Sequence, residues 1–226
     1  MSDAKTFYES QYASFAGQPG YASESRFVDI TSRALERRRL LAPARHRTYA
    51  DLGCGLGFKT HAFARRFERS VGFDEAGAAI ELANKLNDLP TLEFRVADVL
   101  AHDSSERFDF VTAIGLSVLN SRNVHETADR IVALADAYLA DGGVFLIVTQ
   151  SDCSGTEHEG WYHLSGRELK GLATAVASTG RYGTRLYAPH RDPRAYFAFG
   201  AEHALRELGK TLLRRPRDFC LLVRRR

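Results

Sequence analysis

The sequence predicts an α/β fold in which helices cover both faces of a mostly parallel β-sheet. From Thr48 onward, short strand-like runs alternate with helix-like segments of about 10–15 residues, an order typical of parallel βαβ units. The run Phe108–Ile114 is almost continuously apolar, as expected for a strand buried on both faces. No proline-, glycine- or serine-rich linker divides the chain, so residues 46–226 are predicted to form one domain behind an N-terminal segment, residues 1–45.

The N-terminal segment is predicted to contain two helices. In residues 4–16 the aromatic residues recur at a helical spacing, and a Gly-Gln-Pro-Gly break follows at residues 17–20. A second helix is expected from Ser23 to Leu41, and Pro43 should stop it. The inner stripe of this helix would comprise Phe27, Ile30, Ala34, Leu35 and Leu41.

The remaining elements follow from hydrophobic periodicity. Strands are predicted at residues 48–52, 70–73, 92–96, 108–114 and 144–149, and helices at 57–68, 75–86 and 125–139, with a turn at 141–143. The tail is predicted to contain helix 165–178, strand 182–187, helix 194–209 and strand 219–223. We expect its two strands to pair as a reversed hairpin at the edge of the sheet.

Composition argues against several other classes of protein. The net charge of +3 over 226 residues is too small to indicate a nucleic-acid partner. No apolar run approaches the roughly 18 residues of a membrane span, so no span is expected. The cysteines (Cys54, Cys153 and Cys220) are far apart and lack the spacing of a disulfide framework or a metal site. We therefore expect a cytoplasmic protein without a bound metal; both monomer and homodimer stay open.

Glycines recur at alternate positions in the loop Asp51-Leu52-Gly53-Cys54-Gly55-Leu56-Gly57, between a predicted strand and a predicted helix. Because they have no Cβ atom, Gly53, Gly55 and Gly57 let the backbone approach a ligand closely. A dinucleotide-binding loop needs a small residue where this chain has Phe58, and a phosphate-binding loop needs a Gly-Lys-Ser/Thr sequence that this chain lacks. Both alternatives are weakened, and a nicotinamide-dependent oxidoreductase stays open as the nearest rival.

Three carboxylates stand at predicted strand ends. Asp51 precedes the glycine loop, where an anion disfavours a diphosphate but suits the ammonium and sulfonium of S-adenosylmethionine; its other role would be to order the loop. Asp74 lies 21 residues after Gly53, close to the offset of about 20 at which an acid accepts hydrogen bonds from ribose. Asp98 is expected to accept from the exocyclic amine of adenine, while Val99 packs on the ring.

From Tyr49 to about Val148 the chain resembles the class I S-adenosylmethionine-dependent methyltransferases. The motifs that carry the resemblance are the glycine loop, Gly-Phe-Asp-Glu at 72–75, Ala-Asp-Val at 97–99, Phe-Asp-Phe-Val at 108–111 and Leu-Ala-Asp-Gly-Gly-Val-Phe at 139–145. They occur in the order and at the spacing of that family. The resemblance implies a Rossmann-like sheet of seven strands, six parallel and one reversed, and cofactor contacts at Gly53, Gly55, Asp74 and Asp98.

The methyl acceptor is expected to lie between two loops, because ligands of open α/β sheets bind beyond the carboxyl ends of the strands. The first loop is Gly115–Asn120, and the second runs from Gln150 to His163, with residues 151–163 as its core. The N-terminal Tyr8 and Tyr12 are expected to close over the cofactor as a lid, with simple helix packing as the equal alternative.

His158, His163 and Asp152 are the candidate bases for an acceptor that loses a proton during attack. The polar and aromatic character of the second loop favours a hydroxyl-rich acceptor, first a sugar hydroxyl in glycan or natural-product biosynthesis, with Trp161 or Tyr162 stacking on the ring. N- or C-methylation of an aromatic or peptide acceptor remains an alternative. No Asn-Pro-Pro-Tyr or Asp-Pro-Pro-Tyr sequence follows Ile114, which disfavours methylation of adenine, cytosine or glutamine.

Overall fold

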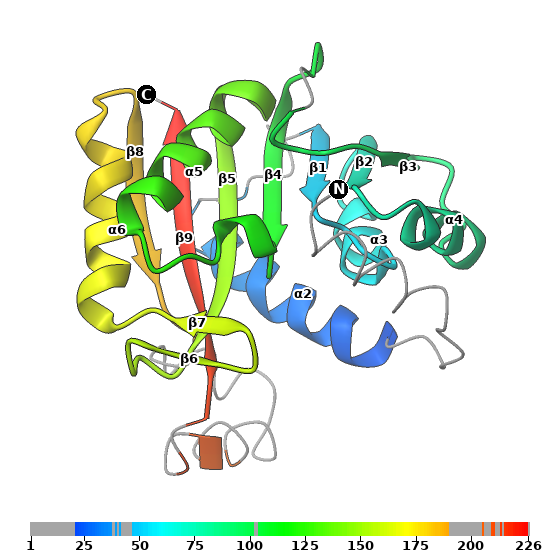
Figure 1. Cartoon of the computed structure of the whole chain (residues 1–226). Coiled ribbons are helices and arrows are strands. Elements are labelled where there is room, and N and C mark those ends of the chain that lie inside the picture. The colour runs from blue at the N-terminus through cyan, green and yellow to red at the C-terminus, as the bar shows by residue number, and fades with distance from the viewer. Residues whose placement is uncertain are drawn as a thin grey trace.

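The computed structural model describes residues 21–37, 39, 41, 47–101, 104–189, 205, 209–210, 213 and 215–225. Its centre is a seven-stranded sheet with the strand order β3-β2-β1-β4-β5-β9-β8 (Figure 1). The strands span Thr48–Leu52 (β1), Arg69–Asp74 (β2), Leu92–Val96 (β3), Phe108–Ile114 (β4), Leu139–Ser151 (β5), Tyr182–Tyr187 (β8) and Arg217–Arg225 (β9). Strand β9 runs opposite to the other six strands of this sheet, which are parallel to one another. The predicted sheet of six parallel strands and one reversed strand is therefore confirmed.

The reversed strand lies where the tail of the sequence predicted it. Strand β9 pairs with β5 on one side and with the outermost strand, β8, on the other, and both pairings are antiparallel. The tail strands are therefore neighbours at this edge of the sheet, as expected. The helix predicted at residues 4–16 lies outside the described residues. So does nearly all of the helix predicted at 194–209.

Two helical layers cover the sheet because its strand residues alternate between its faces. On one face, Phe145 and Ile147 of β5 belong to a core formed with α5 (Val124–Tyr138) and α6 (Gly166–Ser178). On the other face, Val144, Leu146 and Val148 pack with α2 (Tyr21–Arg37) and α3 (Phe58–Ala64). This two-residue period is the geometry of a strand buried on both sides. Helix α4 (Gly77–Leu86) packs Ile80 and Ala83 against Phe94 of β3.

The N-terminal segment is partly built into the core. Val28 and Leu35 of α2, and Leu41 after it, are buried in the same cluster as Tyr49 of β1. Helix α2 ends at Arg37, four residues before the predicted end, and Arg39 then adopts a left-handed φ of 54°. Of the residues predicted to face inward, Leu35 and Leu41 are buried and Phe27 is half-buried.

Three local predictions need correction. Helix α3 ends at Ala64 rather than residue 68, because Arg66 and Phe67 bond carbonyls only three residues back, which tightens the last turn. The turn expected at 141–143 is an irregularity within β5, since the pairing with β4 shifts between Phe108 and Phe110 and Gly142 has a φ of 72°. The loop expected at 151–163 contains a hairpin of two short strands, β6 (Thr156–His158) and β7 (Trp161–His163).

Candidate functional site

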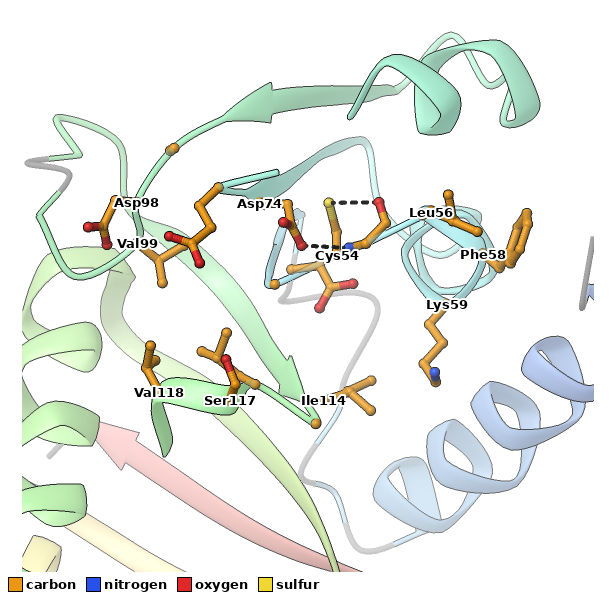
Figure 2. Close-up of a pocket in the computed structure, with 18 residues that line it drawn as sticks. Cys54, Leu56, Phe58, Lys59, Asp74, Asp98, Val99, Ile114, Ser117 and Val118 are labelled. Atoms are coloured by element: carbon orange, nitrogen blue, oxygen red, sulfur yellow. Dashed lines mark hydrogen bonds between the residues drawn. The ribbon is translucent and has the colours of Figure 1, made fainter. Parts of the chain in front are cut away.

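A cleft of about 290 Å³ lies at the carboxyl ends of β1, β2, β3 and β4 (Figure 2). Parallel strands bring their carboxyl ends to one edge of the sheet, so residues far apart in sequence meet there. The residues that line the cleft are Asp51, Gly53, Cys54, Gly55, Leu56, Gly57, Phe58, Lys59, Asp74, Glu75, Ala97, Asp98, Val99, Ile114, Gly115, Leu116, Ser117 and Val118. They include all the predicted cofactor residues except Tyr12, which lies outside the described residues.

The glycine loop forms one wall of the cleft in a backbone conformation that side chains disfavour. Gly53, Gly55 and Gly57 have φ angles of 79°, 51° and 76°. A Cβ atom on Gly57 would overlap the ring of Phe94 and lie 2.9 Å from Nδ2 of Asn87. The Asn87 amide also donates to the carbonyl of Leu56 at 2.9 Å, which ties the loop to the end of α4. Gly57 is therefore required both by the turn and by the close packing behind it.

Asp51 is buried at the base of the cleft and bonded from both sides. Its carboxylate accepts from the hydroxyls of Thr60 in α3 and Thr112 in β4, each at 2.6 Å. The hydroxyls of Tyr49 and Thr112 lie 2.8 Å apart; because Thr112 gives its single proton to Asp51, Tyr49 donates to Thr112. Burial raises the pKa of Asp51, and the two hydroxyl donors and the charge of Lys59 oppose that rise. Asp51 thus joins the end of β1 to α3 and β4.

Asp74 stands at the end of β2 and accepts two backbone hydrogen bonds. Oδ2 accepts from the amide of Gly55 at 2.8 Å, and Oδ1 accepts from the amide of Ala76 at 2.9 Å (Figure 2). A carboxylate has about four acceptor positions, so each oxygen keeps capacity for a further donor. The side chain is half-buried and faces the cleft, a position suited to a diol.

The opposite end of the cleft combines one acid with apolar side chains. Asp98 follows β3, is exposed, and accepts from the amide of Leu100 at 3.0 Å. Figure 2 shows Val99 beside Asp98 after β3, and Val118, which follows β4, lines the same cleft. Ser117 and Val118 belong to the short 3-10 helix η1 (Ser117–Leu119) and line the cleft. The sequence predicted the loop 115–120 as a whole but did not single out these two residues.

The candidate bases form a separate group, with His158 and His163 on the β6–β7 hairpin and Asp152 directly after β5, and none of them lines the cleft. His163 is buried, and its Nδ1 accepts from the amide of Asp152 at 3.3 Å, so the proton of the neutral ring lies on Nε2. His158 is exposed; its Nε2 lies 3.0 Å from the hydroxyl of Thr156 and its ring centroid 5.5 Å from that of His163. Burial opposes ionisation of Asp152, but hydrogen bonds within residues 152–154 and the two histidines lower its pKa overall.

Asn120 joins the two predicted acceptor loops. Its side-chain amide donates to the carbonyl of Tyr162 at 2.9 Å and accepts from the amide of the same residue at 2.8 Å. The hydroxyl of Tyr162 then donates to Glu168 at 2.7 Å, which anchors the hairpin on α6. Asn120 lies in the first of the two predicted loops, but nothing in the local sequence marked it as the residue that docks β7.

A second, smaller cavity lies between the sheet, α5, α6 and the hairpin. It has a volume of about 20 Å³, and Leu116 lines both it and the cleft. Its other walls are almost entirely apolar: Leu119, Thr127, Ile131, Ile147, Val148, Thr149, Trp161, Leu164, Leu169, Leu172, Leu186, Phe219 and Leu221. Trp161 is half-buried there and donates its indole N–H to the carbonyl of Gln150 at 3.1 Å.

Two kinds of feature are absent from the residues that the structure describes. No three histidine, cysteine, aspartate or glutamate side chains gather there in a way that would hold a metal ion. No helix in the same part of the chain has the length and apolar character needed to cross a bilayer.

Comparison with known proteins identifies similar sequences and folds. The profile of the family described as methyltransferase small domain matches residues 13–164. No curated protein matches the chain. Among solved structures, the plantazolicin methyltransferase BpumL in complex with SAH and a monoazolic desmethylPZN analogue is 17% identical, with a TM-score of 0.64 over 99% of this chain and 90% of that chain.

Two other structures show the same fold. DhpI in complex with SAH is 17% identical, with a TM-score of 0.61 over 98% of this chain and 94% of that chain. Magnesium protoporphyrin IX methyltransferase from Synechocystis PCC 6803, with bound SAH, is 11% identical, with a TM-score of 0.59 over 99% of this chain and 95% of that chain. At these identities the likeness concerns the fold.

Proposed function

This chain belongs to the methyltransferase small domain family and is an S-adenosylmethionine-dependent methyltransferase, and we propose that its acceptor is a small molecule that presents a hydroxyl group, first a sugar. The family membership sets aside the nicotinamide-dependent alternative. The observation that supports the cofactor assignment is the cleft itself, in which the glycine loop, Asp51, Asp74, Asp98 and Val99 face one space.

The chemistry of the cleft fits the cofactor. Asp74 offers acceptors to the ribose hydroxyls, and Asp98 offers one to the adenine amine beside apolar Val99. Asp51 supplies a negative charge beside the glycine loop, where the cofactor's ammonium would lie. Tyr12 is proposed to cover the bound cofactor from the N-terminal segment, which would act as the lid, residues 1–45, of the domain 46–226.

When bound, S-adenosylmethionine supplies an electrophilic methyl group on a sulfonium centre. The protein's own contribution is to orient both partners and to exclude water. The 115–120 loop and the β6–β7 hairpin, which Asn120 holds together, would cover the acceptor.

Proton removal is assigned to the hairpin. Of the three candidates, His158 has an exposed ring, whereas Nδ1 of His163 already accepts a hydrogen bond and the pKa of Asp152 is lowered. We therefore assign proton acceptance to His158 and the orientation of its surroundings to His163 and Asp152. The polar residues of the hairpin and the half-buried Trp161 support a sugar, because a sugar ring combines hydroxyls with an apolar face.

The second cavity favours one other acceptor class. Its apolar walls adjoin the cleft at Leu116 and include Trp161, so an acceptor with an apolar part would place a small group of that part against them. This arrangement would suit N- or C-methylation of an aromatic or peptide acceptor.

Cofactor binding and acceptor choice are tested separately. Calorimetry should detect S-adenosylhomocysteine binding and no comparable binding of NADH or NADPH; the reverse result would refute the assignment. Transfer of a labelled methyl group should then be measured with a panel of monosaccharides and a matched panel of phenols and short peptides. Transfer to sugars, with a His158→Gln variant that loses kcat while a His125→Gln control does not, supports the proposal. Transfer only to the second panel would replace the sugar by an apolar acceptor.

A further inference from the structure

One short segment after β4 separates the cofactor cleft from the smaller apolar cavity. Of the described residues, Leu116 alone lines both spaces. The residues of η1 that follow it divide between the two: Ser117 and Val118 line the cleft, whereas Leu119 lines the cavity. The two spaces therefore meet at the side chain of Leu116.

That side chain is held in place by the glycine loop and by the backbone on either side of it. A Cβ atom on Gly53 would lie 2.6 Å from Cδ1 of Leu116, so the leucine fills the space that a side chain on the loop would need. The amide of Gly115 donates to the carbonyl of Val148 at 2.9 Å, which fixes the end of β4 on β5. The amide of Leu119 donates to the carbonyl of Leu116 at 3.0 Å and closes the turn on the other side.

The cavity lies on the side of Leu116 that the proposed function gives to the acceptor. Trp161 of the β6–β7 hairpin lines it together with residues of α5 and α6, and none of the described residues proposed to bind the cofactor does so. The hairpin is docked on the 115–120 loop by Asn120. The size of the side chain at position 116 therefore bears on the acceptor.

The room behind Leu116 is small and apolar. A volume of about 20 Å³ accommodates little more than one water-sized group, and the largely aliphatic walls favour an alkyl group over water. A smaller residue in place of Leu116 would remove the wall that this cavity shares with the cleft of about 290 Å³. An apolar part of the acceptor would then extend from the cleft into the space between the sheet, α5 and α6.

We propose that Leu116 determines acceptor specificity by closing the apolar cavity to the cleft, which limits the wild-type protein to acceptors whose apolar group is about the size of a methyl group. The inference rests on the proposed function, because it takes the 115–120 loop and the hairpin to enclose the acceptor. Leu116 acts by its volume, since an aliphatic side chain neither donates nor accepts a hydrogen bond.

The size of the effect follows from the burial of alkyl groups. Each methylene moved from water into an apolar space strengthens binding by about fourfold. A butyl group has three methylenes more than a methyl group, so complete burial would favour it by roughly 50-fold once the space is open. Incomplete filling lowers this gain, and we expect about 10- to 50-fold.

The test compares acceptors that differ in an alkyl group alone. The probes are the methyl and butyl β-glycosides of D-glucose and of D-galactose, and the pair 4-methylphenol and 4-butylphenol. Transfer of a labelled methyl group gives kcat/KM for each probe, and the ratio of the butyl to the methyl member is compared between variants. Weaker folding or cofactor binding lowers both members of a pair alike, so the ratio reports specificity.

Four variants are compared with the wild type. Leu116→Ala and Leu116→Val shorten the side chain by different amounts, and Leu116→Met nearly keeps its volume. Leu119→Ala enlarges the cavity but leaves Leu116 in place. Thermal unfolding establishes which variants are folded, and Leu116→Val carries the test if Leu116→Ala is not.

The proposal expects the ratio to rise by about 10- to 50-fold in Leu116→Ala and by less in Leu116→Val, while Leu116→Met and Leu119→Ala stay close to the wild type. An unchanged ratio in the folded shortened variants would overturn the proposal, and so would an equal rise in Leu119→Ala.

The same measurements separate this inference from the proposed function. Transfer to the phenols alone would replace the sugar as acceptor, and the ratio for the phenol pair would then decide the role of Leu116. A wild-type protein that binds S-adenosylhomocysteine but methylates none of the probes would refute the hydroxyl-bearing acceptor and, with it, the role given to Leu116.

Discussion

Gly57 is the loop glycine whose surroundings are most restrictive. Its φ of 76° disfavours any side chain, and its missing Cβ is where the Phe94 ring packs. Gly142 has a similar φ of 72° but open space around it. The two positions therefore separate backbone strain from steric overlap in one protein.

We predict that Gly57→Ala lowers the free energy of unfolding by about 2–4 kcal/mol, the sum of a left-handed alanine and an overpacked contact. Gly142→Ala should cost only the backbone contribution of about 1–2 kcal/mol. Urea denaturation of the two variants measures the difference. Equal losses would show that Phe94 moves aside without cost.

Asp74 illustrates a residue whose role follows from position and neighbours together. It already accepts from two backbone amides, so its carboxylate is held in place before any ligand arrives. We predict that Asp74→Ala weakens the binding of S-adenosylhomocysteine by about 1–3 kcal/mol, because the ribose hydroxyls lose a charged acceptor. Asp88→Ala, in the loop after α4, is the calorimetric control. An unchanged affinity in Asp74→Ala would remove Asp74 from the site.

At the scale of elements, the β6–β7 hairpin shows how a short segment is placed by contacts beyond its own sequence. Its turn has Glu159 and Gly160 at φ angles of 52° and 76°, the two positive values that a tight two-residue hairpin requires. The glycine was a usable signal for the turn. The docking of the hairpin depends on Asn120, which is 42 residues from Tyr162.

We predict that Asn120→Ala releases β7 from the loop after β4. The amide of Tyr162 loses its acceptor, so its hydrogen exchange should accelerate by about 10-fold, and KM for the acceptor should rise while the Kd of S-adenosylhomocysteine stays the same.

Arg122→Gln breaks an exposed ion pair with Glu157 and the contact of the guanidinium with the Tyr162 ring, but leaves the Asn120 bonds intact, and serves as the control. It should leave exchange nearly unchanged, because exposed ion pairs contribute little. If Arg122→Gln accelerates exchange as much as Asn120→Ala does, the Asn120 bonds are not what holds the hairpin.

At the scale of the whole molecule, an ion-pair network joins the strands at the edge remote from the tail. Glu106, before β4, pairs with Arg69 of β2 at 2.5 Å and with Arg95 of β3 at 3.0 Å. The hydrogen bond from Arg69 is the largest influence; with Arg95 it outweighs burial and lowers the pKa of Glu106 from 4.5 to about 2. The folded protein therefore binds a proton there less readily than the unfolded chain.

The sign of the pH dependence follows from that lowered pKa. The stabilisation is fully present above about pH 4.5 and is lost as the pH falls through about 2. We predict that Glu106→Gln lowers the free energy of unfolding by about 1 kcal/mol at pH 7. The difference from the wild type should shrink between pH 4.5 and pH 2, as the wild-type carboxylate becomes protonated. Glu81→Gln, which removes an exposed pair with Lys85, should change stability less. A difference independent of pH would contradict the role of the Glu106 charge.

Much of the architecture was determined by the sequence itself. The bounds of β1, β3, β4 and β8 were predicted residue by residue, because apolar runs and turns are local signals. The cleft was predictable as well, since the glycine loop, Asp74 and Asp98 each follow a strand and parallel strands bring those ends together.

Only the tertiary structure decided how the remaining residues meet. Asp51 is bonded by hydroxyls from α3 and β4, and Asn120 bonds the backbone of Tyr162, although neither relation has a local pattern. Two of the candidate bases, His158 and His163, lie on the β6–β7 hairpin and Asp152 directly after β5, and all three are outside the cleft lining. Periodicity specifies which side of an element is buried, whereas the partner across the fold depends on packing and register, which no single segment encodes.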